Sequence, residues 1–428
     1  NILWGLASNM TSVPTDCPQR DERLGWMGDA QAFAPTACYN KNMMRFFSKW
    51  ENDITDCQFE NGAVNDVNPA IVVKGPAKPG WGDAVYVMPW VLYNFYGDRQ
   101  ILENNYDAMA GWVDYMTSLS KNYLFEIEGY GDWVAVEASP SAPIGSAYYF
   151  YGAKMISEMA GILGKTADEQ KYKKLSEKIA VAFNKRHFDA TKNSYAGDTQ
   201  AANLLPLAFG IVPKELELAV ANTIAENVKA KGNHISTGFL GTPLILPMLS
   251  KYGFHDIAWK TASQTSYPSW GYMAEQGATT IWELWNSDTE GPGMNSRNHF
   301  ALGSCGEWYY SHLAGIRPTT EAPGFKKIIL APMPPEGLDW AQASIKTSYG
   351  LVSSAWRKNK KSIEYNFVIP ANTTAVFHLP FLDKNIKSVM ESNVLIYENG
   401  EVKPTADMTL LETGENKATI SLNSGDYR

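Results

Sequence analysis

The hydrophobic pattern of this chain changes its period once, near Pro318, and that change limits the folds it can adopt. From about residue 29 to 316, apolar residues recur every three or four positions, as on one face of an α-helix. After Pro318, apolar and polar residues alternate, as in 363–369 and 375–379, which is the pattern of half-buried strands. The sequence therefore predicts a mainly helical domain over 1–316, followed by a small all-β sandwich over 317–428.

The clearest helical pattern covers residues 99–119. Its apolar stripe consists of Ile101, Leu102, Tyr106, Met109, Trp112, Val113 and Met116. Similar patterns recur at 84–96, 145–163, 168–184, 214–229 and 300–315, and loops rich in Gly, Pro and aromatic residues lie at 61–83, 129–144, 265–280 and 286–298. Helices that alternate with long loops predict a ring of helix pairs with a site at one end. Turn signals divide the second part at Tyr349-Gly350, Pro370-Ala371-Asn372, Asn399-Gly400 and Ser424-Gly425.

Composition excludes several classes of function. The 37 Lys and Arg against 45 Asp and Glu leave no basic field for a nucleic acid, and no apolar run reaches the ~20 residues of a membrane span. The four Cys and six His show no metal-binding spacing, so we expect no metal and no organic cofactor. The cysteines favour free thiols and leave one disulfide open. Polar residues interrupt any signal-peptide core near the start, so cellular location is not assigned, and neither is oligomeric state.

The densest group of polar residues is the segment 16–29, DCPQRDERLGWMGD. It holds four carboxylates, two arginines and a tryptophan, and its Pro and Gly residues predict a shaped loop. Crowded carboxylates raise one another's pKa, which keeps an acid protonated near neutral pH, while arginines have the opposite effect. A solvated surface loop of salt bridges is the alternative. The embedded Gly-Trp pair and the flanking apolar stretches favour a partly buried site.

A second candidate is the run TTIWELW at 279–285, in which Glu283 stands between Trp282 and Trp285. Burying a carboxylate is costly, so this acid must be paired or functional, and the pattern alone leaves both open. Paired carboxyl groups can carry out acid–base chemistry, and acids far apart in sequence can meet at one end of a ring of helix pairs.

The segment DCPQRDERLGWMGDAQ closely resembles the signature of the α-L-rhamnosidases of glycoside hydrolase family 78. The segments Gly80–Asp83, Gly131–Trp133, TTIWELW and Asn298-His299 follow in compatible order, so the resemblance covers nearly the whole chain. It implies an (α/α)6 barrel whose loops bind rhamnose, followed by a β-sandwich. The implied activity is release of terminal α-L-rhamnose, with inversion, from a rhamnose-containing glycoside or polysaccharide. Family members normally carry β-domains ahead of the barrel, and this sequence starts fifteen residues before the motif, so we expect none within it.

The resemblance also assigns roles to individual residues. Glu22 matches the general acid of the family and Glu283 its general base. The residues that match polar groups around the sugar hydroxyls are Asp16, Arg20 and Asp29, with His299 as a further sugar contact. Trp26, Trp81 and Trp133 look like aromatic walls. Glu275, shortly before the second motif, is a rival for the role of the base.

Two other functions are considered. A different (α/α)6 glycosidase, acting on a glucoside or fucoside, would share the fold, but the long first motif argues against it. A non-catalytic carbohydrate-binding derivative of the enzyme is the second alternative, and the presence of both Glu22 and Glu283 weighs against it. The group attached to the rhamnose is left open.

Overall fold

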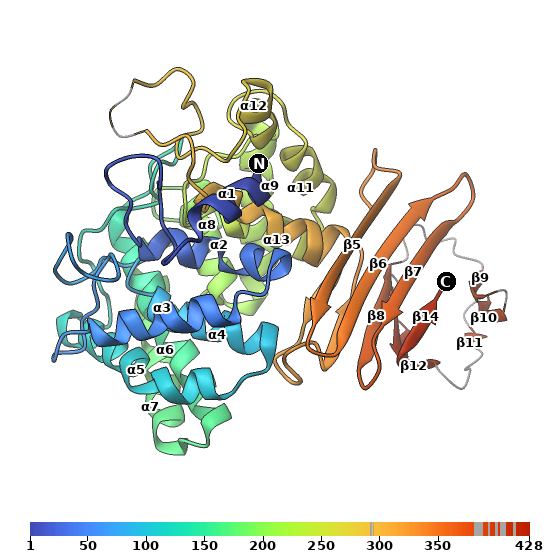
Figure 1. The fold of residues 1–428 in the computed structure, drawn as a ribbon, viewed down its shortest axis with the longest axis horizontal. Coiled ribbons are helices and arrows are strands. Elements are labelled where there is room, and N and C mark those ends of the chain that lie inside the picture. The colour runs from blue at the N-terminus through green and yellow to red at the C-terminus, as the bar shows by residue number, and fades with distance from the viewer. Residues whose placement is uncertain are drawn as a thin grey trace. The chain divides into compact units, whose positions relative to one another are not determined.

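The computed structural model describes residues 1–291, 293, 295–380, 388–392, 394–398, 401–402, 408–413 and 417–428. The chain forms two compact units (Figure 1). The first contains 1–91 and 99–305, and the second contains 92–98 and 306–428. No helix within the described residues is long and apolar enough to cross a membrane.

The first unit is built from helices. They are α1 (Ile2–Asn9), α2 (Met27–Asn40), α3 (Met44–Asp56), α4 (Ala84–Tyr96, whose last residues belong to the second unit), α5 (Gln100–Leu119), α6 (Ser141–Leu163), α7 (Thr166–His187), α8 (Gln200–Phe209), α9 (Glu217–Ala230), α10 (Thr242–Lys251), α11 (His255–Ala262) and α12 (Trp270–Glu275). Short elements are the strands β1 (Phe188–Asp189) and β2 (Ser194–Tyr195) and the 3₁₀ turns η1 (Lys214–Leu216) and η2 (Ala301–Cys305). Consecutive helices pack against each other as hairpins, namely α6 with α7, α8 with α9 and α10 with α11.

Helix α5 shows why these segments are helical. All seven residues of its predicted apolar stripe are buried, with Leu102, Met109, Trp112, Val113 and Met116 fully so. Each fully buried large apolar side chain stabilises the fold by about 1.5–3 kcal/mol relative to exposure, so one buried face holds the helix in place. Helix α7, by contrast, is rich in Lys and Glu and buries few residues.

Most of the predicted helices are confirmed, and one is wrong. The predictions at 84–96 and 99–119 agree with α4 and α5 almost to the residue, and α6, α7 and α9 lie at the other predicted positions. The stretch 300–315 is not one regular helix but η2, a single α turn α13 (Gly306–Trp308) and the π turn η3 (Tyr309–Leu313). Gly303 and Gly306 explain part of this, because glycine disfavours a continuous helix. The predicted loop 265–280 contains the short helix α12, which Ser269 caps by accepting a hydrogen bond from the backbone N–H of Tyr272.

Apart from the end of α4 and the turns α13 and η3, the described residues of the second unit form β-sheets and loops. A five-stranded sheet has the order β12 (Met408–Thr413), β13 (Lys417–Leu422), β8 (Thr374–Pro380), β4 (Lys327–Leu330) and β3 (Ile316–Pro318). A four-stranded sheet has the order β14 (Gly425–Tyr427), β7 (Ile363–Ile369), β6 (Gly350–Lys358) and β5 (Trp340–Thr347). A small sheet joins β11 (Glu401–Val402), β10 (Val394–Glu398) and β9 (Ser388–Glu391).

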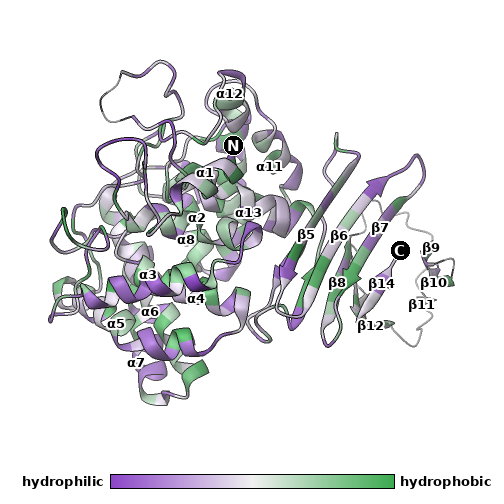
Figure 2. Cartoon of the chain, viewed as in Figure 1, coloured by the Kyte–Doolittle hydropathy of each residue, from purple (hydrophilic) through white to green (hydrophobic). Residues whose placement is uncertain are grey.

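The two larger sheets face each other through aromatic side chains. The rings of Phe367 on β7 and Phe377 on β8 lie 4.8 Å apart, and Tyr365 also contacts Phe377. Figure 2 shows the hydropathy changing between hydrophilic and hydrophobic along β5, β6 and β7. The two sheets and the aromatic contacts between them confirm the predicted all-β domain. The turns at Tyr349-Gly350, between β5 and β6, and at Pro370–Asn372, between β7 and β8, are also confirmed, and Gly425 begins β14. The turn at Asn399-Gly400 lies outside the described residues.

Candidate active site

The first motif is a closed, irregular segment that leads into α2. The backbone N–H of Asp16 donates to the carbonyl of Leu24 at 3.0 Å, and the N–H of Leu24 donates to Asp16 Oδ1 at 2.7 Å. Asn9, the last residue of α1, donates from its amide to the carbonyls of Thr15 and Asp16, both at 2.9 Å. The predicted loop is therefore confirmed up to Trp26, whereas Asp29 lies in the first turn of α2.

Burial within this motif is uneven. Asp16, Cys17 and Asp29 are buried, Arg20 and Glu22 are partly exposed, and Asp21 and Arg23 are exposed. The alternative of a solvated surface loop fails for the buried members, because surface loops do not exclude water from two carboxylates.

Glu22 lies between donors but keeps access to solvent. Its Oε1 accepts a hydrogen bond from the indole N–H of Trp26 at 2.8 Å, and its Oε2 lies 3.4 Å from a guanidinium nitrogen of Arg20. The side chain is 28% exposed. This arrangement fixes the direction of the carboxyl group and leaves it accessible to a bound molecule, as a general acid requires.

Cys17 joins Glu22 to Asp16. Its Sγ lies 2.7 Å from Asp16 Oδ2 and 3.6 Å from Glu22 Oε2. Burial raises the pKa of the Cys17 thiol, so the group stays protonated and acts as a donor. Burial, and then the charge of Asp29, raise the pKa of Asp16 to about 6. One ligand atom from each of Asp16, Cys17 and Glu22 lies within 4.8 Å of the others. The four cysteines, all in the described part of the chain, form no disulfide.

Glu283 is buried and held by hydrogen bonds to Ser296. Its backbone N–H donates to the carbonyl of Ser296 at 2.8 Å, and the N–H of Ser296 donates back to Glu283 Oε2 at 2.9 Å. The indole N–H of Trp133 lies 3.4 Å from Oε1. Only 5% of Glu283 is exposed. Its carboxylate is paired with these N–H donors, and the backbone contacts with Ser296 set its position.

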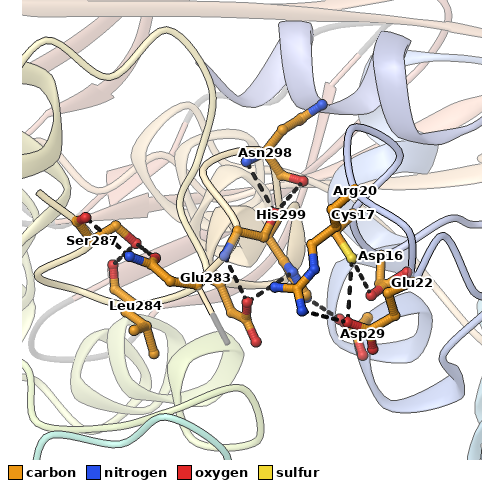
Figure 3. Close-up of polar contacts among 12 residues, drawn as sticks. Asp16, Cys17, Arg20, Glu22, Asp29, Glu283, Leu284, Ser287, Asn298 and His299 are labelled. Carbon is orange, nitrogen blue, oxygen red and sulfur yellow. Dashed lines mark hydrogen bonds and ion pairs between the residues drawn. The ribbon is translucent and has the colours of Figure 1, made fainter. Parts of the chain in front are cut away.

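His299 connects the two motifs across 270 positions of sequence. Its Nε2 makes a hydrogen bond to Oδ1 of Asp29, and its Nδ1 lies 3.8 Å from Glu283 Oε2. Figure 3 shows the imidazole between Glu283 and the group formed by Asp16, Cys17, Glu22 and Asp29. Burial lowers the pKa of His299, but the charge and hydrogen bond of Asp29, together with Glu283, outweigh burial and raise the pKa to about 9.

We expect the charge on His299 to make stability depend on pH. Because its pKa rises from 6.5 to about 9 on folding, its contribution to the free energy of unfolding is complete below pH 6.5 and is lost as the pH rises through 9. Urea unfolding at a series of pH values should show a steeper loss of stability between these limits in the wild type than in His299→Asn. Parallel pH profiles for the two proteins would contradict a charged His299.

Three tryptophans of the predicted aromatic walls meet at Tyr130. The Tyr130 ring lies 4.8 Å from Trp81 and 6.0 Å from both Trp26 and Trp133, in edge-to-face geometry, which is a favourable aromatic arrangement. The Tyr130 hydroxyl donates to Asp66 at 2.9 Å. Trp81 is 3% exposed, whereas Trp26 and Trp133 are partly exposed and offer ring surface. The sequence interpretation missed Tyr130, although it directly precedes the flagged segment Gly131–Trp133.

Two buried aspartates hold the loops that carry Trp133 and Trp81. Asp132 accepts backbone N–H groups from Gly238, Leu240 and Gly241 at 2.7, 2.8 and 3.0 Å, and burial raises its pKa to about 6. Asp83 accepts hydrogen bonds from the N–H of Gly80, the Tyr86 hydroxyl and the Trp112 indole. These hydrogen bonds fix the two loops.

Gly28 lets α2 approach the ring of Trp81. A Cβ at this position would lie 2.5 Å from the Trp81 ring, far inside contact distance. Gly28 therefore has a packing role.

Glu275, the rival for the base, is the last residue of α12 and is exposed, which favours Glu283 as the base. Among the carboxyl groups of the site, the partly exposed Glu22 and the buried Glu283 are the pair that can carry out general acid–base chemistry.

The chain matches two family models. Residues 1–313 match the bacterial alpha-L-rhamnosidase 6 hairpin glycosidase domain, and residues 315–393 match the bacterial alpha-L-rhamnosidase C-terminal domain. An alpha-L-rhamnosidase of Formosa agariphila is 36% identical over 441 residues, covering 100% of this chain and 46% of that protein.

Two solved structures of α-L-rhamnosidases are similar to this chain over its whole length. The α-L-rhamnosidase of Streptomyces avermitilis complexed with L-rhamnose matches with a TM-score of 0.90 and 36% identity, over 100% of this chain and 41% of that one. The α-L-rhamnosidase from Dictyoglumus thermophilum matches with a TM-score of 0.93 and 37% identity, over 100% and 48%. The chain thus spans less than half the length of these relatives. Its helical part is a six-hairpin, (α/α)6 glycosidase domain followed by an all-β domain, and the chain belongs to the bacterial α-L-rhamnosidase family.

Proposed function

We propose that this chain hydrolyses terminal α-L-rhamnosides with inversion of configuration, with a catalytic domain over 1–316 and a C-terminal β-sandwich domain over 317–428. The observation that carries the proposal is the contact of His299 with both Asp29 and Glu283, because it brings the two acidic motifs into one site. The relatives named above are α-L-rhamnosidases, and one of them was solved with L-rhamnose. The substrate is a rhamnose-containing glycoside or polysaccharide.

In the proposed reaction Glu22 is the general acid. Its proton passes to the glycosidic oxygen as the bond between that oxygen and C1 breaks, and Arg20 and Trp26 hold the carboxyl group in position. Glu283 is the general base. It removes a proton from a water molecule that attacks C1 from the opposite face, with the carboxyl groups of an inverting pair about 6.5–9.5 Å apart.

The remaining site residues bind the sugar in this proposal. Asp16, Arg20, Asp29 and His299 supply charged groups to the ring hydroxyls. Trp26, Trp81 and Trp133 supply apolar surface, and the exposure of Trp26 and Trp133 favours these two as the rings in contact.

The first sugar released tests the mechanism. Proton NMR of early hydrolysis of an aryl α-L-rhamnoside should show β-L-rhamnose first, with the α anomer appearing later by mutarotation, because water enters opposite the leaving group. Early α-L-rhamnose would contradict inversion and point to a retaining pair about 5–5.5 Å apart. A panel of nitrophenyl glycosides provides the control for specificity, since preference for a glucoside or fucoside would contradict the proposed substrate.

A further inference from the structure

Each of the two acids in the proposed reaction accepts a hydrogen bond from a tryptophan. The indole N–H of Trp26 donates to Glu22 Oε1 at 2.8 Å, and the indole N–H of Trp133 donates to Glu283 Oε1 at 3.4 Å. Hydrogen bonds are directional, so the orientation of each indole ring helps to set the orientation of its carboxyl group. A residue that fixes both indole rings therefore acts on both acids.

The ring of Tyr130 contacts both of these tryptophans. Its centroid lies 6.0 Å from that of Trp26, with an angle of 84° between the rings, and 6.0 Å from that of Trp133, with an angle of 78°. Within the residues that the structure describes, neither indole contacts another aromatic ring. In an edge-to-face pair the positive edge of one ring meets the negative face of the other, so an indole that turns loses this contact.

The hydroxyl end of Tyr130 is anchored to the backbone at the start of α2. The hydroxyl donates to Oδ2 of the buried Asp66 at 2.9 Å, and Oδ1 of Asp66 accepts the backbone N–H of Lys78 at 2.7 Å. The carbonyl of Asp66 accepts the N–H of Met27, the residue after Trp26, at 2.9 Å. One aspartate thus fixes the end of the Tyr130 ring and the backbone next to Trp26.

Two further contacts hold Tyr130 in place. The buried ring of Trp81 lies 4.8 Å from the Tyr130 ring and packs against it edge-to-face. Two residues after Tyr130, the carboxylate of Asp132 accepts three backbone N–H groups from the segment 238–241. The backbone, the ring and the hydroxyl of Tyr130 are therefore all held by this chain itself, before any substrate binds.

We propose that Tyr130 is a positioning residue that directs Glu22 through Trp26 and Glu283 through Trp133. The inference rests on the proposed function, from which it takes the roles of the two acids. A misplacement of about 1 Å in a catalytic geometry can lower the rate by about 10²-fold. Loss of the Tyr130 ring should therefore slow the chemical step more than it weakens the binding of the sugar.

Two substitutions at Tyr130 test the role of its ring. Tyr130→Leu keeps an apolar side chain without a ring, and kcat for 4-nitrophenyl α-L-rhamnoside should fall at least about tenfold while KM changes less than about threefold, because misdirected acids weaken the transition state alone. Tyr130→Phe keeps the ring and should keep at least about a third of kcat. A rise in KM with kcat unchanged, or an equal loss of kcat in Tyr130→Phe, would overturn the proposal.

A double-mutant cycle tests the path through Trp26. Trp26→Phe keeps a ring beside Tyr130 but has no N–H for Glu22. Tyr130→Leu should therefore cost at least about threefold less in kcat in the Trp26→Phe protein than in the wild type, and the loss that remains passes through Trp133. Losses of kcat that simply multiply would overturn the proposal.

Phe125→Leu is the matched control for the loss of a ring. Phe125 is buried and contacts the ring of Tyr149, so its replacement should lower the urea midpoint of unfolding while kcat stays near that of the wild type. An equal loss of kcat in Phe125→Leu would show that Tyr130→Leu acts by loosening the fold, and would overturn the proposal. Absence of rhamnoside hydrolysis by the wild type would overturn the proposed function as well, whereas the other outcomes would overturn the role of Tyr130 alone.

Discussion

Glu283→Gln should slow the hydrolysis of all rhamnosides alike, by about 10²–10⁴-fold, because an amide cannot accept the proton of the attacking water. The substitution keeps an oxygen for the N–H of Ser296, so the buried site should keep its shape. Azide should partly restore turnover, since an anionic nucleophile needs no base. The measurement is kcat/KM across aryl rhamnosides with leaving phenols of different pKa.

Glu22→Gln should give a different pattern on the same series. Rhamnosides with poor leaving groups should lose most activity, and those with acidic phenols should be partly spared, because they need less protonation. Equal losses on good and poor leaving groups would show that Glu22 is not the acid. Glu275→Gln is the matched control: its exposed side chain lies at the end of α12, and its activity should equal that of the wild type.

Removing one ring hydroxyl from the substrate should have an effect of similar size. A ring-deoxy rhamnoside should react about 10⁴-fold more slowly than the rhamnoside, because it leaves buried polar groups of the site without a partner. Asp29 and His299 are both nearly inaccessible to water, so water cannot readily replace the lost hydroxyl. Comparison of kcat/KM for the two glycosides with the same phenol is the measurement. Ready turnover of the deoxy sugar would refute binding through the ring hydroxyls.

The α-L-mannoside is the control for the apolar side of the same pocket. It differs from the rhamnoside by one hydroxyl on the methyl group, and a hydrophobic wall rejects such an addition by only about 10²-fold. Equal rates on mannoside and rhamnoside would refute an apolar wall at Trp26 and Trp133.

Local patterns in the sequence were sufficient for much of the fold. The stripe on α5 and the alternation on β7 predict their elements because burial on one face requires the period of the element itself. The prediction of a regular helix at 300–315 is wrong. A 3₁₀ turn followed by a π turn keeps apolar residues at helix-like spacing but interrupts the regular α-helical hydrogen bonds.

The sequence predicts less of the candidate site than of the fold. Its acids could be chosen from motifs and a family resemblance, but the contact between His299 and Asp29 depends on how the ring of helices closes. The partners of Asp132 are backbone N–H groups of Gly238, Leu240 and Gly241, which carry no side-chain signature. Tyr130 looks like an ordinary core aromatic until its three tryptophan neighbours are seen together.

The contact between Asp29 and His299 has a consequence for synthesis of the protein. A ribosome makes the first motif before Glu283 and His299, which follow only after more than 250 further residues, near the end of the helical unit. Until then Asp29 has no imidazole beside it, and burial of its charge is unfavourable. The first motif should therefore stay hydrated on the nascent chain. Its carboxyl groups and Glu283 should come together in one site only when the last helical hairpins have docked.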